Sequence, residues 1–198
     1  AGRLCPETLH MMTLGWALVG FVLGAIPCSV WLGRLFLHDD VRRYGDGNPG
    51  GANAWRLGGW RLGAIAILLD FLKGAVPVGL AHFYMGIKDE RLIAIALAPV
   101  LGHAFSPFLG FRGGKALAVT FGIWSGLTLA GGPLTLGVAC ILAVAVQQND
   151  AWSVMLAMLI LLFYLLGQRA ESAMLAIWAG NFVGTDADFE PAFSSAPG

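Results

Sequence analysis

Charged side chains are scarce in this sequence. Asp, Glu, Lys and Arg make up 12% of the 198 residues, whereas an ordinary soluble domain has about 25%. Hydrophobic residues make up 57%, and the mean hydropathy is +0.72. So few charges cannot cover the surface of a soluble domain of this length, which indicates a polytopic helical membrane protein.

The sequence also lacks the usual marks of nucleic-acid and metal sites. Twelve basic and twelve acidic residues balance, so no charge excess points to a nucleic-acid partner. Cys5, Cys28 and Cys140 lie far apart without a CxxC spacing, which favours small buried side chains over redox or metal ligands. Walker A, HExxH and GxSxG patterns are absent. We therefore expect neither a metal nor an organic cofactor.

Long apolar runs separated by short polar segments are present instead. Residues 14–33 are twenty residues without a charge, enough for a helix to cross a hydrocarbon core of about 30 Å. The runs predict an all-α fold, a polytopic transmembrane helix bundle of six or seven spans. The expected spans are 14–33, 62–85, 92–109, a helix from Ala116, 134–146 and 152–166, with a weak seventh at 172–183.

The domain organisation and orientation follow from the same pattern. We expect one transmembrane domain over residues 1–184 and a disordered acidic tail over 185–198, where acids, prolines and small polar residues gather. Arginines concentrate in 34–61 and basic residues recur in 110–116 and 168–171. The positive-inside rule then predicts that these three segments are cytoplasmic and that the N-terminus is outside.

The polar segment contains an unusual stretch, GDGNPGGANAWR, at residues 45–56. Glycine permits backbone angles that let N–H groups converge on an anion. The Asn48 amide and the Arg56 guanidinium add further donors, and the planar arginine fork matches a phosphate. A loop of this kind also serves simply as a tight turn between helices, so taken alone it is weak evidence for a ligand.

A second glycine-rich loop, FRGGKALAV, follows the third span. It sets Gly113, Gly114 and Lys115 just ahead of an expected helix, where an anion is favoured by the helix start and by the nearby cation. Because both loops are predicted on one side of the membrane, together they indicate a site for a phosphorylated substrate at the cytoplasmic surface.

Three of the ionisable residues inside expected spans are candidates for the site. Asp70 and Lys73 are three apart and share a helix face. Intramembrane charges are costly and often functional, so Lys73 is either a phosphate ligand or half of a structural pair. His103 lies ten residues before Gly113. It is either a satisfied core histidine or a phosphate ligand or general base.

Four motifs in this order resemble one family. FVLGAIPCSVWLGRL, GDGNPGGANAWR, LDFLKG and GHAFSPFLGFRGGKALAVTFG are similar to motifs of the PlsY family, the bacterial membrane glycerol-3-phosphate acyltransferases that use acyl phosphate. The resemblance covers about residues 14–122. It implies transfer of a fatty acyl group from acyl phosphate to the 1-hydroxyl of glycerol 3-phosphate, giving lysophosphatidic acid and phosphate for phospholipid synthesis. It also implies a multi-pass protein of the bacterial inner membrane with a cytoplasmic active face.

The resemblance also implies site residues. By position, the first motif contributes Asn48, Gly50, Asn53 and Arg56 to substrate binding, with Asp46 in the same loop. The expected partners are glycerol 3-phosphate, acyl phosphate and membrane lipid.

The second motif contributes His103, Gly113, Gly114 and Lys115. We take His103 and Lys115 as the catalytic residues and the glycines as substrate-binding. Since acyl phosphate is already activated, the reaction needs no covalent enzyme intermediate. His103 or a substrate phosphate oxygen accepts the proton.

Two departures from the family pattern leave an alternative open. Asp46 stands where the family loop, G-S-G-N-x-G-A-T-N, has serine, and only Ser153 marks the region 151–154 where a third, serine-bearing motif is expected. A carboxylate repels a phosphate to which a hydroxyl would donate. The alternative is a non-catalytic relative that binds a phosphorylated lipid precursor or partners an active enzyme. A small transporter, suggested by the intramembrane charges, is a third interpretation.

Overall fold

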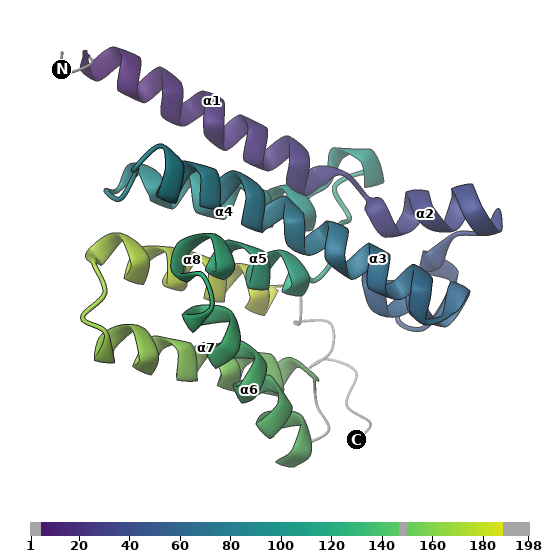
Figure 1. Ribbon diagram of the computed structural model, residues 1–198. Helices are drawn as coiled ribbons and strands as arrows, with labels where there is room; N and C mark the ends of the chain where they lie inside the picture. The colour runs from purple at the N-terminus through teal and green to yellow at the C-terminus, as the bar shows by residue number, and fades with distance from the viewer. Residues whose placement is uncertain (1–4, 147–149, 188–198) are drawn as a thin grey trace.

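The computed structural model describes residues 5–146 and 150–187, and over these ranges it is helical with no strand (Figure 1). In chain order the elements are α1 Pro6–Ala25, α2 Cys28–Leu37, the 3-10 turn η1 Val41–Arg43, α3 Gly51–Gly79, the π-helical turn η2 Leu80–Tyr84, α4 Arg91–Ala104, the 3-10 turn η3 Pro107–Leu109, α5 Leu117–Thr128, α6 Gly131–Val146, α7 Asp150–Gly167 and α8 Ser172–Ala187.

Seven apolar helical segments correspond to the expected spans, which confirms the all-α membrane bundle. Three are long and apolar enough to cross a membrane: Glu7–Leu37, Gly51–Tyr84 and Arg91–Leu109. Four shorter apolar helices follow: Leu117–Thr128, Gly131–Val146, Trp152–Gly167 and Ser172–Gly184. A 12-residue helix such as α5 is only about 18 Å long.

The first expected span is broken rather than continuous. α1 ends at Ala25, Ile26 is extended, and α2 begins after Pro27, whose ring removes a backbone donor. The break frees two carbonyl groups inside the bundle, and distant side chains satisfy both. Ser106 Oγ donates to Ala25 O at 2.5 Å, and Lys73 Nζ donates to Ile26 O.

The second span begins eleven residues earlier than expected, because α3 starts at Gly51 instead of residue 62. The polar composition of 51–61 indicated a loop, but Asn53 and Ala54 are buried. Ala54 packs with Val30 and Val41 in a small apolar cluster beside α2. Gly59, at φ +73°, marks a kink where this first part meets the longer apolar part of α3.

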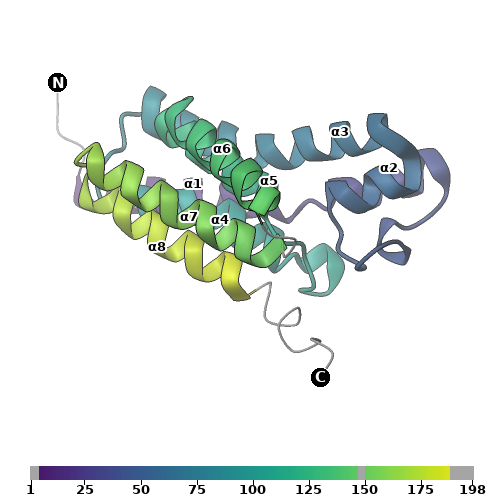
Figure 2. The ribbon, with the colours of Figure 1, turned by 90° about the horizontal axis from the view of Figure 1, so that it is seen from below.

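Close helix pairs build the larger core. α1 packs along α4, and α3 packs along α5. A Cβ atom on Gly102 would lie 2.1 Å from Phe21 O, and one on Gly122 would lie 2.1 Å from Phe71 O. Only glycine allows this backbone approach, which is the usual role of small residues between membrane helices. α7 and α8 complete the bundle side by side (Figure 2).

The helix directions place the polar segments at two opposite ends. Both glycine-rich loops lie at one end, while the start of α1, the α3–α4 turn and the α7–α8 turn lie at the other (Figure 1). Residues 88–91 and 171–173 line one hollow there. The prediction that 168–171 shares a side with the two loops is therefore wrong. α5, α6 and α7 each reverse direction, so three crossings separate 168–171 from the loop at 110–116.

The predicted tail boundary is also too early. α8 continues through Ala187, so residues 185–187 are helical rather than part of a tail. The remainder of the predicted tail, 188–198, lies outside the described residues. One domain over 1–184 stays the simplest interpretation, because α3 to α8 share a single large apolar cluster that includes the buried Trp124 and Ile177.

Candidate functional site

The two glycine-rich loops meet at the end of α4. A Cβ atom on Gly114 would lie 2.6 Å from His103 Nε2 and 3.2 Å from Asn48 Oδ1. Gly113 N donates to Ala104 O at 2.9 Å and Gly114 N donates to His103 O at 3.2 Å. The structure therefore brings His103, Asn48 and the second loop together. In this arrangement both glycine N–H groups are engaged by α4, and the glycines serve close approach.

Asp46 forms the direct link between the loops. Its Oδ2 accepts a hydrogen bond from Lys115 Nζ at 2.8 Å. Its Oδ1 accepts from Asn53 Nδ2 at 2.8 Å and from the Asn48 backbone N–H at 3.2 Å. Partial burial acts to raise the pKa of Asp46, but the bonds from Lys115, Asn48 and Asn53 outweigh it and lower the pKa from 3.8 to about 2. The carboxylate is therefore ionised in the loop.

Asn53 and Arg56 organise the first loop from within α3. Asn53 Nδ2 also donates to Asn48 O at 3.0 Å, and Arg56 Nη1 donates to Asn53 Oδ1 at 2.8 Å. Gly45, at φ +58°, has no room for a side chain, because a Cβ atom there would lie 2.0 Å from Arg56 Nη1. Gly50 N donates to Asn48 O at 2.8 Å just before α3 begins. The predicted residues of the first motif thus form one connected network.

His103 lies in the last turn of α4 and is 8% exposed. Its ring faces the backbone of Gly114 at the junction of the loops. Burial there, beside a polar loop, suits either a core role or contact with a ligand held between the loops.

Lys73 is held differently from the other predicted site residues. Its ammonium group donates to Asp70 Oδ1 at 2.6 Å and to Ile26 O, and its side chain is 6% exposed. These contacts hold Lys73 at the break between α1 and α2, and its role in substrate binding stays a prediction. Ser153 is likewise buried, in the first turn of α7.

Sequence reasoning missed two features of this region. The first is the Asp46–Lys115 ion pair. Opposite charges in two loops that are predicted to share one face of the membrane favour such a pair. The second is Asn181 in α8, which is 0% exposed. It accepts from Trp124 Nε1 at 3.2 Å and donates to Thr120 Oγ1 at 3.1 Å, tying α8 to α5. An amide side chain inside an apolar stretch of the sequence indicates a buried polar contact of this kind.

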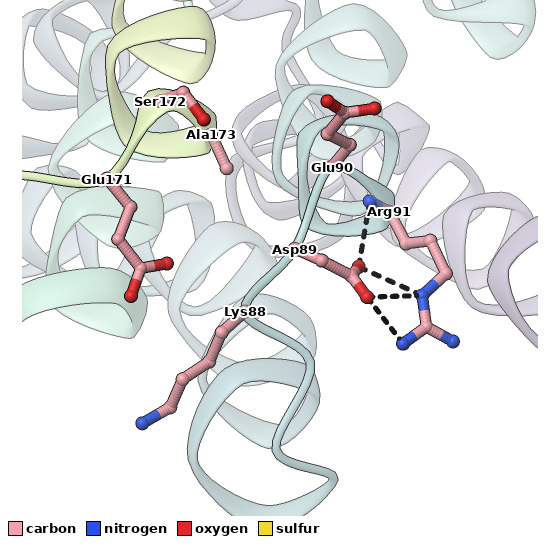
Figure 3. A pocket seen from close by; sticks show the side chains of 7 residues that line it. All are labelled: Lys88, Asp89, Glu90, Arg91, Glu171, Ser172 and Ala173. Carbon is pink, nitrogen blue, oxygen red and sulfur yellow. Dashed lines mark hydrogen bonds and ion pairs between the residues drawn. The ribbon is translucent and has the colours of Figure 1, made fainter.

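An open hollow of about 510 Å³ lies at the opposite end of the bundle (Figure 3). An ion pair between Arg91 and Asp89, 2.7 Å long, forms part of its wall. None of the predicted site residues lines it. The residues that line it are Lys88, Asp89, Glu90, Arg91, Glu171, Ser172 and Ala173.

Known proteins share this fold. The integral membrane glycerol 3-phosphate acyltransferase PlsY superposes in its glycerol 3-phosphate form with a TM-score of 0.85 at 24% identity, over 92% of this chain and 90% of that one. Its lysophosphatidic acid form gives 0.83 at 23% identity, with the same coverage. At these identities the likeness establishes the fold.

Curated relatives extend the likeness to sequence. Glycerol-3-phosphate acyltransferase 1 of Thermotoga maritima is 42% identical over 120 residues, which are 60% of this chain and 59% of the relative. The Enterococcus faecalis enzyme is 40% identical over 54% of this chain and 48% of its own, and the Lactiplantibacillus plantarum enzyme is 34% identical over 74% and 72%. The chain thus spans about half the length of the first relatives it matches.

The match to the family as a whole covers more of the chain than the matches to these curated relatives do. The family model described as glycerol-3-phosphate acyltransferase matches residues 14–185. That range contains both glycine-rich loops and every apolar helical segment from the second half of α1 to the greater part of α8. The chain belongs to the glycerol-3-phosphate acyltransferase family.

Proposed function

We propose that this protein transfers a fatty acyl group from acyl phosphate to the 1-hydroxyl of glycerol 3-phosphate. The hydroxyl oxygen attacks the acyl carbonyl carbon and the bond from that carbon to the phosphate oxygen breaks. The hydroxyl proton passes to His103 or to a phosphate oxygen. The products are lysophosphatidic acid and inorganic phosphate. The observation that supports this most directly is the meeting of two donor-rich loops beside His103 at one end of an apolar bundle.

Most of the predicted residues have a task in this reaction. Lys115 and Arg56 supply positive charge for the two phosphate groups, and Asn48 and Asn53 supply amide donors. Gly50, Gly113 and Gly114 let the loops approach closely. Since acyl phosphate carries its own leaving group, the protein contributes mainly positioning and stabilisation of the oxyanion that develops at the carbonyl. A buried histidine at the junction is suitably placed for proton transfer.

The proposal includes a location. The protein would lie in the bacterial inner membrane with both loops at the cytoplasmic face, where soluble glycerol 3-phosphate meets an acyl phosphate and membrane lipid. In a background without Cys5, Cys28 and Cys140, cysteines placed at Arg43 and Arg112 should resist an impermeant thiol reagent added outside. A cysteine at Lys88 should react. Labelling of Arg43 and Arg112 positions from outside would overturn this orientation.

The decisive experiment is a transfer assay. Membranes that contain this protein as their sole acyltransferase should form lysophosphatidic acid when given acyl phosphate and glycerol 3-phosphate. Product formation should require both substrates. Lys88→Ala, at the opposite end of the bundle, is the matched control for Lys115→Ala. Equal product in membranes with and without the protein would refute the proposal.

One observation favours the non-catalytic alternative. The Asp46 carboxylate already accepts hydrogen bonds from Lys115, Asn48 and Asn53. The acyltransfer reaction would need the same donors to bind a phosphate. A relative that binds a phosphorylated lipid precursor without turning it over would tolerate this. The transporter interpretation loses its support, because Asp70 and Lys73 bind each other and a core carbonyl.

A further inference from the structure

The Asp46–Lys115 ion pair differs from every other ion pair between described residues. The remaining five join residues at most six apart in the sequence. Asp46 and Lys115 are 69 apart and come from different loops. This contact therefore holds the two loops together, instead of stabilising a single turn.

Three donors of different kinds converge on the Asp46 carboxylate. They are the Lys115 ammonium at 2.8 Å, the Asn53 amide at 2.8 Å and the Asn48 backbone N–H at 3.2 Å. An ammonium, an amide and a backbone N–H form the kind of donor set that binds a phosphate oxygen. In this structure the chain's own carboxylate receives it. The loops therefore form an anion site that is filled from within.

The carboxylate is able to leave this position. Its side chain is 47% exposed, whereas that of Asp70, the other lysine-bound aspartate among the described residues, is 4% exposed. Asp46 stands between Gly45 and Gly47, both at positive φ, where glycine gives the backbone freedom. A Cβ atom on Gly47 would come no nearer than 3.5 Å to its surroundings, the nearest atom being Arg42 O. The backbone at Gly47 is therefore not crowded.

We propose that Asp46 is a displaceable internal anion that occupies the donors of the two loops until a ligand replaces it, and that it restricts the site to phosphate dianions. A ligand must take Lys115 from Asp46, and a group with two negative charges competes for the ammonium better than a single carboxylate does. Arg56, bonded to Asn53, offers a second cation to the extra charge. The inference rests on the proposed function for its substrate, but it concerns binding and requires no turnover.

The test measures Lys115 directly in the full chain, purified in detergent micelles. An amine held in an ion pair acylates slowly, because little of it is deprotonated. Acetylation of Lys115 by acetic anhydride, followed by mass spectrometry, reports its release. Asp46→Asn should raise the acetylation rate several-fold without ligand. Inorganic phosphate should then protect Lys115 at a roughly tenfold lower concentration in the variant than in the wild type, since one like charge has gone.

Three comparisons keep the experiment interpretable. Asp89→Asn breaks an ion pair at the opposite end of the bundle and should leave both measurements for Lys115 unchanged. Asp46→Ser provides a second variant if the first folds poorly. Acetate at the protective phosphate concentration should not shield Lys115 in the wild type.

Equal acetylation rates in wild type and both variants, or an unchanged protective phosphate concentration, would overturn the proposal. Protection by acetate as strong as that by phosphate would overturn it too. Phosphate protection with no lysophosphatidic acid formed would refute the acyltransferase function while supporting the internal anion.

Discussion

Two aspartate–lysine pairs in this protein have similar lengths and opposite surroundings. Asp70 and Lys73 lie 2.6 Å apart on one turn of α3, with side chains 4% and 6% exposed. Asp46 and Lys115 lie 2.8 Å apart across two loops, with side chains 47% and 33% exposed. The lengths of the two ion pairs are similar, so the difference in their roles comes from their exposure to solvent and from the other groups that each pair contacts.

The buried pair cannot exchange its partners with water. Lys73 also donates to Ile26 O at the break between α1 and α2, so the pair is part of the packing of three helices. The loop pair is open to solvent on one side and lies among donors suited to an anion. An aspartate–lysine ion pair therefore has a structural role in the core and forms an exchangeable contact at the surface.

Breaking the buried pair should have the largest effect. Lys73→Met leaves the Asp70 carboxylate buried without its partner, which costs about 3–5 kcal/mol, a large share of the stability of a typical domain. We expect the variant to be recovered poorly and to unfold at a much lower temperature in detergent. Thermal unfolding followed by size-exclusion chromatography would measure this.

The double variant Asp70→Leu/Lys73→Met sharpens the same comparison. Replacing both charges by apolar groups removes the desolvation cost, so much of the lost stability should return. Lys88→Met, at an exposed position, should be neutral. A Lys73→Met protein as stable as the wild type would show that the pair has no structural role.

Breaking the loop pair at Lys115 should affect function instead of folding. On the proposed function, Lys115→Ala removes a charge-assisted contact to a phosphate, which is worth roughly 1.5–3 kcal/mol. Acyl transfer should therefore fall ten- to hundredfold or below detection, while the unfolding temperature changes little, because exposed pairs contribute little to stability. Lysophosphatidic acid formation and thermal unfolding should be measured on the same preparation. Unchanged turnover would show that the second loop is only a turn.

The fold was largely predictable from the sequence, because charge-free runs of membrane length have few alternatives. What failed were the details that depend on distant partners. The break after Ala25 is stabilised by Ser106 and Lys73, which supply donors from distant parts of the chain. The early start of α3 depends on Ala54 packing beside Val30. Neither contact is visible in local hydropathy.

The site was predictable as a set of loops but not as a network. Glycine and amide patterns indicated which residues gather, and Asn48, His103 and Gly114 do lie together. The contact between Asp46 and Lys115 could not be predicted, because nothing local to either loop fixes a contact between residues 69 apart. The charge of Lys73 predicts either a phosphate ligand or a structural pair, and the structure adds that it contacts Asp70 and Ile26 O.

Changing Asp46 should have a smaller effect, in the opposite direction from Lys115→Ala. Asp46→Ser removes the internal anion and adds a hydroxyl donor, and one charge at about 4–6 Å from a phosphate matters by a kcal/mol or more in a partly shielded site. We expect measurable but low transfer by the wild type and higher transfer by the serine variant in matched membranes. Robust wild-type transfer that falls in the variant would instead make Asp46 an active participant, such as a base.

The smallest effect concerns the pH dependence of stability. The pKa of Asp46 is lowered from 3.8 to about 2 in the folded protein. Its ionised form therefore stabilises the fold at pH values above its pKa in the unfolded chain. That contribution is present above about pH 4 and disappears as the pH falls through about 2. It should stay below about 1 kcal/mol, because the pair is half exposed. The wild type should therefore unfold at a slightly higher temperature than Asp46→Asn at pH 6, and this difference in unfolding temperature should disappear toward pH 2.

High salt at pH 6 should reduce the difference in unfolding temperature as well, since the Debye length is about 3 Å at 1 M. Thermal unfolding of both proteins across this pH range measures it, and a constant difference from pH 6 to pH 2 would show that the Asp46 carboxylate is not held in the folded loops.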